Sequence, residues 1–275
     1  GDIDLEGSID VNGTANLDVV DIDGAVDMAT TLAVAGNVDF NGDLDVDGTT
    51  NLDVVDVDGA ANFAADVTIA TGADLLTASA GTDNVRIGLD AGDSIADGGI
   101  RNIVIGRNAG TAITTGDSNV AIGWEALKTE DAHGNNTAIG ASALATQNAG
   151  ADAYNVGIGY NAGTAVTTGI RNTLIGGLAG DALTDADRNT AVGYIALSAD
   201  TLGSRSTAIG HGALQTQNFT SATDAYNTAV GHSAGLAVTT GVQNTLIGGL
   251  AGDAITTGHR NTMLGYHSGS SLTTA

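Results

Sequence analysis

Three Asp-x-Asp-Gly runs near the start of the chain offer paired carboxylates. The pairs are Asp21 and Asp23, Asp45 and Asp47, and Asp56 and Asp58. Carboxylate oxygens are ligands that Ca²⁺ prefers, but the runs lack the further ligands and the distal Glu of an EF-hand loop. A solvated strand face is therefore the favoured interpretation. A calcium site, with carboxylates gathered from three chains around a symmetry axis, is the alternative.

Rings form the second set of candidate residues. Six follow a recurring Gly and two precede a recurring Asn: Trp124, Tyr160, Tyr194, His211, His232 and Tyr266, then Tyr154 and Tyr226. A row of rings is a platform on which sugar faces can stack. Packing between coils or between chains is the alternative, and it is favoured in a chain with few bulky residues. The five His residues show no spacing that would set three imidazoles around one metal. We expect no cofactor.

Catalytic motifs are missing from the sequence. There is no Ser–His–Asp order, metal-ligand motif or phosphate-binding loop. An Asp pair assembled between chains would suit glycan hydrolysis, but no particular pair stands out. We therefore expect that the protein is not an enzyme.

The elements that position these residues follow a short repeat, in which Asn is followed by Thr or Val, a small or aliphatic residue, Ile and Gly. The Gly recurs at a nearly constant interval, at positions 88, 106, 123, 140, 159, 176, 193, 210, 231, 248 and 265. So strict a period predicts a solenoid or repeat fibre of eleven coils over residues 84–275. Four coils form a larger repeat, because Ala-Tyr-Asn at 153–155 returns at 225–227. Insertions such as 147–152 are expected to project as loops.

Two columns of apolar residues are predicted to fill the coils. The residue three after the motif Asn is Ile, Val or Leu in every copy, and the residue seven after it is Ala in all copies except Ser268. We interpret both columns as inward-facing. The motif Asn is expected to bend the chain, and Asn side chains stacked coil upon coil can form a ladder along a solenoid.

The N-terminal part has a different rhythm. In residues 1–70, acidic and apolar residues alternate between Gly residues spaced by about six or twelve positions, which predicts a β-helix-like or β-prism-like shaft of short strands. Residues 71–83 break this rhythm and are interpreted as a junction. Strands this short bury little alone, so we expect three chains to intertwine as a homotrimer. Both chain ends look cut, as in a segment of a longer product.

Charge narrows the choice of partners. The net charge is −24, and residues 1–83 hold 18 acidic and no basic residues. Such a surface repels nucleic acid and anionic membranes. No stretch approaches the roughly 20 apolar residues of a membrane-spanning helix. We expect neither nucleic-acid binding nor membrane insertion.

The Asn-Thr-Ala-Ile-Gly repeat with Thr-Thr-Gly between copies resembles the repeats of phage tail fibres and other virion appendages. It is also similar to the head repeats of trimeric autotransporter adhesins, which are parallel β-rolls, so the resemblance implies an all-β parallel β-solenoid or β-roll. The resemblance covers residues 84–275. It implies a homotrimeric fibre on a virion or cell surface that attaches to a host glycan or protein receptor. A bacterial trimeric adhesin or extracellular filament is one alternative, and a glycan-degrading tail spike is another.

Overall fold

A computed structural model describes residue 61 and residues 81–274. The chain divides into two compact units, Gly1–Val67 and Thr68–Ala275, and the description below concerns the second. The predicted shaft over residues 1–70, most of the junction over 71–83, and the six aspartates considered for calcium lie outside the described residues.

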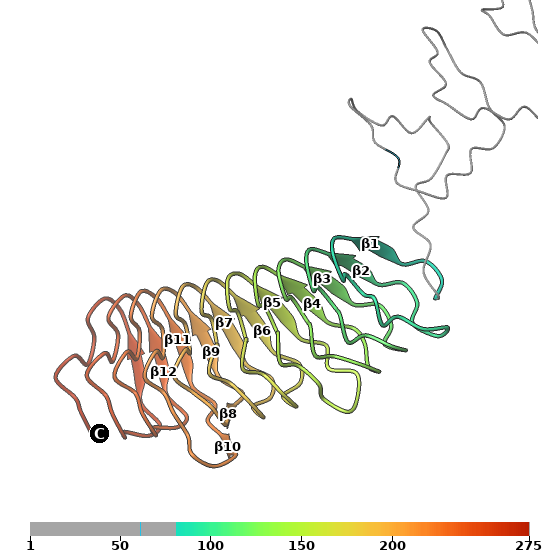
Figure 1. Ribbon diagram of the computed structural model, residues 1–275. Coiled ribbons are helices and arrows are strands. Elements are labelled where there is room, and N and C mark those ends of the chain that lie inside the picture. Colours follow the sequence, from blue (N-terminus) through green and yellow to red (C-terminus); the bar gives the residue numbers. More distant parts are fainter. Residues whose placement is uncertain (1–60, 62–80, 275) are drawn as a thin grey trace, which may run out of the picture. The chain divides into compact units, whose positions relative to one another are not determined.

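The described part is an all-β parallel solenoid with one strand in each of eleven coils. The strands stack side by side in chain order (Figure 1) and every neighbouring pair is parallel. The eleven-stranded sheet comprises β1 (Val85–Ile87), β2 (Ile103–Ile105), β3 (Val120–Ile122), β4 (Thr137–Ile139), β5 (Val156–Ile158), β6 (Thr173–Ile175), β7 (Thr190–Val192), β9 (Thr207–Ile209), β11 (Thr228–Val230), β12 (Thr245–Ile247) and β13 (Thr262–Leu264). The prediction of a parallel solenoid with one copy of the motif in each coil is confirmed.

The expected asparagine ladder is present. The backbone N–H of Asn119 donates to Oδ1 of Asn102, one coil earlier, at 2.9 Å, and the same link recurs along the solenoid. The side-chain amide of a ladder Asn then donates to a backbone carbonyl further along its own coil, as Asn172 does to Ala186 at 2.8 Å. One buried side chain thus satisfies polar groups of two coils, which explains why Asn recurs.

One of the two predicted core columns faces outward instead. In most three-residue strands the middle residue is buried and its neighbours are partly exposed, because side chains alternate between the faces of a sheet. Val104, Leu174 and Leu246 therefore fill the coil, whereas Ile87 is 50% exposed and Ile247 is 38% exposed. We call the residue two after the motif Asn the inner strand column and the residue three after it the outer strand column. The Ala column, in contrast, is buried as predicted.

Two further columns complete the core, and their residue types vary together. We call the residue eight after the motif Asn the hinge column and the residue eleven after it the turn column. The hinge column is Gly where the turn column is aliphatic, as in the pair Gly180 and Leu183. It is Leu where the turn column is polar, as in the pair Leu144 and Gln147.

The available space explains why the hinge column is Gly in some coils and Leu in others. A Cβ added to Gly180 would lie 2.8 Å from side-chain atoms of both Leu174 and Leu183, so a larger residue does not fit there. Leu144 and Leu214 occupy the same left-handed backbone conformation, with φ of 47° and 50°. That conformation costs about 1–2 kcal/mol for a residue with a Cβ, whereas complete burial of Leu contributes about 1.5–3 kcal/mol. Burial therefore offsets the strain where the neighbouring inner strand residues are small, as Ala138 and Gly157 are near Leu144.

The insertions of the two longest coils form loops, as predicted. The second loop contains β10 (Thr223–Asp224), which pairs in parallel with β8 (Gly203–Ser204) as a separate two-stranded sheet (Figure 1). Gln147 lies inside the coil and not in the loop that follows it. Within the described part of the chain, no helix is long and apolar enough to span a membrane.

Candidate binding face

The predicted ring residues lie directly beyond the strands, where the chain leaves the sheet. The motif Gly ends each strand with a positive φ, and the next side chain projects from the solenoid. Trp124, Tyr160, Tyr194 and Tyr266 are between 50% and 78% exposed, and His211 and His232 are also exposed. Exposed rings on successive parallel strands can present one continuous surface to a ligand.

Three of these rings form an unbroken row on consecutive strands of the sheet. The ring centroids of Tyr194 and His211 are 5.6 Å apart, and those of His211 and His232 are 5.1 Å apart with an interplanar angle of only 8°. We call Tyr194, His211 and His232 the ring row. Each ring of the row packs against a ring of a neighbouring coil. The same side chains are also exposed to solvent.

Glycines separate the other rings from this row. Tyr160 is separated from Tyr194 by Gly177, and Tyr266 is separated from His232 by Gly249. A Cβ added to Gly177 would lie 3.4 Å from the ring of Tyr194, so that ring rests against the glycine of the preceding coil. Trp124 is separated in the same way by Ala141, and the structure does not bring it into the row.

Tyr154 and Tyr226 lie near the N-terminal ends of β5 and β11, where the insert loops lead into these strands, and thus at the opposite ends of the strands from the other rings. They are 53% and 50% exposed. The guanidinium of Arg205 lies 5.6 Å from the ring centroid of Tyr226, and its Nε lies 2.8 Å from Oδ1 of Asp224. That carboxylate raises the pKa of Arg205. The second insert loop therefore presents a tyrosine held by a cation, a feature that the repeat pattern did not reveal.

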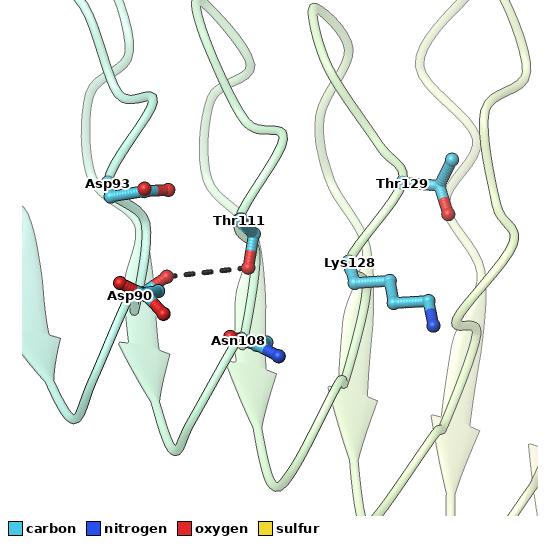
Figure 2. Close-up of a pocket in the computed structure, with 6 residues that line it drawn as sticks. All are labelled: Asp90, Asp93, Asn108, Thr111, Lys128 and Thr129. Atoms are coloured by element: carbon cyan, nitrogen blue, oxygen red, sulfur yellow. Dashed lines mark hydrogen bonds between the residues drawn. The ribbon is translucent and has the colours of Figure 1, made fainter.

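A shallow groove of about 450 Å³ crosses the turns of the first three coils (Figure 2). It is lined by Asp90, Asp93, Asn108, Thr111, Lys128 and Thr129. Thr111 Oγ1 donates to the carbonyl of Asp90 at 3.3 Å, and Lys128 extends away from the two aspartates to pair with Glu125 at 2.6 Å. The groove is open to solvent, and a sugar or a cation could contact its carboxylates without being enclosed.

Comparison with models of protein families, with curated proteins and with solved structures found no match.

Buried polar residues of the turn column are the features that the sequence analysis missed. Glu130, Gln147, Asp200 and Gln217 are all fully buried. Oε2 of Glu130, Nε2 of Gln147 and Nδ2 of Asn136 have no hydrogen-bond partner, although each atom is shielded from solvent. Burial raises the pKa of Glu130, while the backbone N–H of His133 opposes that rise. The alternation of Gly and Leu in the hinge column was the available signal, because Leu marks each coil whose turn column is polar.

Proposed function

We propose that this chain is a structural and adhesive segment of a homotrimeric fibre, most simply a virion tail fibre that attaches to a host surface. Its partners would be two further copies of the chain and a cell-surface glycan or protein receptor. Nucleic-acid binding, membrane insertion and catalysis are not part of the proposal. A bacterial trimeric adhesin would share the same assembly and the same mode of attachment.

The outward face of the sheet is the observation that carries the proposal. Eleven strands place the outer strand column on one face, where it forms a continuous aliphatic stripe. In this column Ile209 and Ile247 are each 38% exposed, Ile87 is 50% exposed and Leu264 is 77% exposed. A monomeric protein rarely leaves a contiguous apolar stripe in water. Association of three copies through this face would cover the stripe and would produce a long, stiff fibre.

The exposed rings support a role in attachment. Tyr194, His211 and His232 present a row of ring faces, and one such row would occur on each chain of a trimer. Individual contacts between a ring and a sugar are weak, but linked copies bind a repetitive surface with an avidity far above that of one site. Attachment of this kind needs no catalytic centre.

Light scattering tests the assembly. We expect the purified protein to have three times the mass of one chain, which is 27.0 kDa. The double variant Ile209→Asp/Ile247→Asp places two charges on the apolar stripe and should dissociate the trimer. Thr168→Asp, at an exposed turn, is the matched control and should leave the mass unchanged. A stable, folded wild-type monomer of 27.0 kDa would refute the trimer.

Incubation with host polysaccharide tests attachment. Retention of the trimer on the immobilised polysaccharide should fall in Tyr194→Ala/His211→Ala and stay unchanged in Thr168→Asp. Unchanged retention of the ring variant would remove the ring row from the proposal. Sustained release of reducing ends would instead favour the glycan-degrading spike, since an adhesive fibre leaves the polymer intact.

A further inference from the structure

The turn of the third coil gathers three different metal-ligating side chains in one short stretch. The ligand atoms of Glu130, Asp131 and His133 all lie within 4.8 Å of one another. Glu130 Oε1 and His133 Nδ1 are 3.5 Å apart. Two ligands that each lie about 2.0–2.2 Å from one tetrahedral ion are separated by nearly this distance. Two of the three donors therefore already have the spacing of a metal site.

Unused bonding capacity is the second observation. The side chain of Glu130 is fully buried, and its Oε2 has no hydrogen-bond partner. Nδ1 of His133 is also shielded from solvent without a hydrogen bond. Buried carboxylate and imidazole groups normally have partners, because an unsatisfied one loses its hydration without compensation. A cation bound between the carboxylate of Glu130 and Nδ1 of His133 would compensate both groups for their lost hydration.

The backbone fixes this turn in place. The carbonyl of Asp131 accepts hydrogen bonds from the backbone N–H and the Oγ1 of Thr114 in the preceding coil. The carbonyl of His133 accepts a hydrogen bond from Nδ2 of Asn119 at 3.0 Å. The backbone N–H of His133 donates to Glu130 Oε1 at 3.2 Å. Little ordering is left for a metal to impose, which favours binding.

We propose that Glu130, Asp131 and His133 form a binding site for a divalent transition-metal ion such as Zn²⁺. The imidazole ligand selects a first-row transition ion over Ca²⁺ or Mg²⁺, which prefer ligand sets made of oxygen alone. Neutral His133 would bind through Nδ1 and leave its Nε2–H for solvent. Water would complete the coordination, and the ion would fasten the turn of the third coil.

The chain contains its own comparison for this site. One four-coil repeat later, Asp200, Thr201, Leu202 and Gly203 stand where Glu130, Asp131, Ala132 and His133 stand. There the carboxylate of Asp200 accepts hydrogen bonds from the backbone N–H of Gly203 and Phe219 and from Nε2 of Gln217. The second carboxylate and the imidazole are absent from that turn. The fold therefore accommodates Thr and Gly at the positions of two proposed ligands.

Calorimetric titration of the full chain with ZnCl₂, after treatment with a chelator and dialysis, tests the site. We expect one strong site per chain in the wild type and a loss of affinity of at least about tenfold in Asp131→Thr and in His133→Gly. His232→Tyr removes an exposed imidazole from the ring row and should bind Zn²⁺ like the wild type. Circular dichroism should show that all three variants fold.

Thermal denaturation gives an independent measurement. Added Zn²⁺ should raise the melting temperature of the wild type and of His232→Tyr, with a much smaller rise in Asp131→Thr and His133→Gly. Two results would overturn the site: no strong binding by the wild type, or equal binding by the wild type and both ligand variants.

Discussion

The two four-coil units of the solenoid, residues 119–188 and 189–260, share one frame but treat their buried polar groups differently. In the second unit, Gln217 donates to Asp200 and to Ser206 and accepts from Asn227. In the first unit, Gln147 accepts from Asn155, but its Nε2 has no partner, and neither has Oε2 of Glu130. One unit has a closed hydrogen-bond network where the other has unused donors and acceptors.

This difference separates what the repeat requires from what it tolerates. Both units keep Leu in the hinge column, Ala in the Ala column and a polar residue in the turn column of the same two coils. The identity of the polar residues varies, and so does the share of their hydrogen-bond donors and acceptors that have partners. Since an unsatisfied buried group costs about 1–3 kcal/mol, the first unit is expected to be the less stable of the two unless a ligand compensates.

The largest predicted effect comes from the leucines of the hinge column. Leu144 contacts Gly157 and Gly163 of the next coil, and Leu214 contacts Gly235. Truncation to Ala in either unit leaves a cavity and should lower the free energy of unfolding by about 2–5 kcal/mol. Leu144→Ala should cost more, because Gly157 has no side chain to fill the space, whereas the second unit has Ala229 at the same position.

Urea denaturation measures the effects of Leu144→Ala and Leu214→Ala, and a double variant tests the packing explanation. A Cβ at Gly157 would lie 2.7 Å from Cγ of Leu144, so Gly157→Ala should destabilise the wild type. In the Leu144→Ala background the same change should be neutral or stabilising. Additive effects of the two substitutions would contradict this account of the packing.

The sequence predicted the architecture of the coils but assigned one column to the wrong face. The period, the Ala column and the asparagine ladder follow from residue type alone. The outer strand column looked like core because it is uniformly aliphatic. The true inner strand column varies from Gly157 to Ala191 to Leu174 because leucines of the hinge column, such as Leu144 next to Gly157, take up space in some coils. Uniformity along a repeat therefore does not separate core from surface, because the uniform Ala column is buried whereas the uniform outer strand column faces outward.

The candidate sites were less accessible to prediction. The sequence identified the exposed rings, but only coil-to-coil stacking showed that Tyr194, His211 and His232 form a row while Trp124 lies apart. The proximity of Glu130 to His133 depends on a turn whose backbone bonds to the preceding coil. No one-dimensional spacing reports such a contact. The buried position of Glu130 became evident only from the columns of the folded coil.

The second prediction exchanges the two buried carboxylates for amides. Asp200→Asn turns an acceptor of three hydrogen bonds into a group with a donor facing Gln217, and should lower the free energy of unfolding by about 3 kcal/mol. Glu130→Gln removes a carboxylate that lacks one partner. In the presence of a chelator at neutral pH it should raise the free energy of unfolding by about 1 kcal/mol.

The pH dependence of stability provides a separate measurement for Glu130. Burial raises its pKa in the folded state above the ordinary value of 4.5, so the folded state holds this proton more tightly than the unfolded state. The contribution of Glu130 to the free energy of unfolding is therefore greatest below that value and declines as the pH rises through the raised pKa. Glu130→Gln should remove this decline, and an unchanged pH profile would show that Glu130 is not its source.

The third prediction concerns the ladder residue of the two longest coils. The other ladder amides donate to a carbonyl fourteen residues later. For Asn136 that residue is Gly150, which lies on the exposed insert loop, and Nδ2 of Asn136 has no acceptor. The second unit has Ser206 at this place, and its Oγ accepts from Gln217. Asn136→Ser removes this unpaired amide but also removes Oδ1, which accepts a hydrogen bond from the backbone N–H of Asn155 at 3.1 Å, so the net change in the free energy of unfolding should be small. Ser206→Asn should cost about 1–2 kcal/mol in urea denaturation, because it adds an amide without an acceptor.

The smallest predicted effect lies at the surface of the insert loops. Arg205 pairs with Asp224 and stacks on Tyr226, whereas the first unit has Asn135 at the position of Arg205, so Tyr154 lacks this partner. Arg205→Asn should lower the free energy of unfolding only slightly, because exposed ion pairs are screened by solvent.

Salt dependence distinguishes the ion pair from simple packing. The effect of Arg205→Asn should shrink in about 1 M NaCl, where the screening length is about 3 Å. Hydrogen exchange should report faster opening of the backbone hydrogen bonds between β8 and β10, since Arg205 adjoins β8 and pairs with Asp224 at the end of β10. If the second loop exchanges at the same rate with and without Arg205, the pairing of these two short strands holds the loop, and the cation over Tyr226 contributes only to the surface that a ligand would contact.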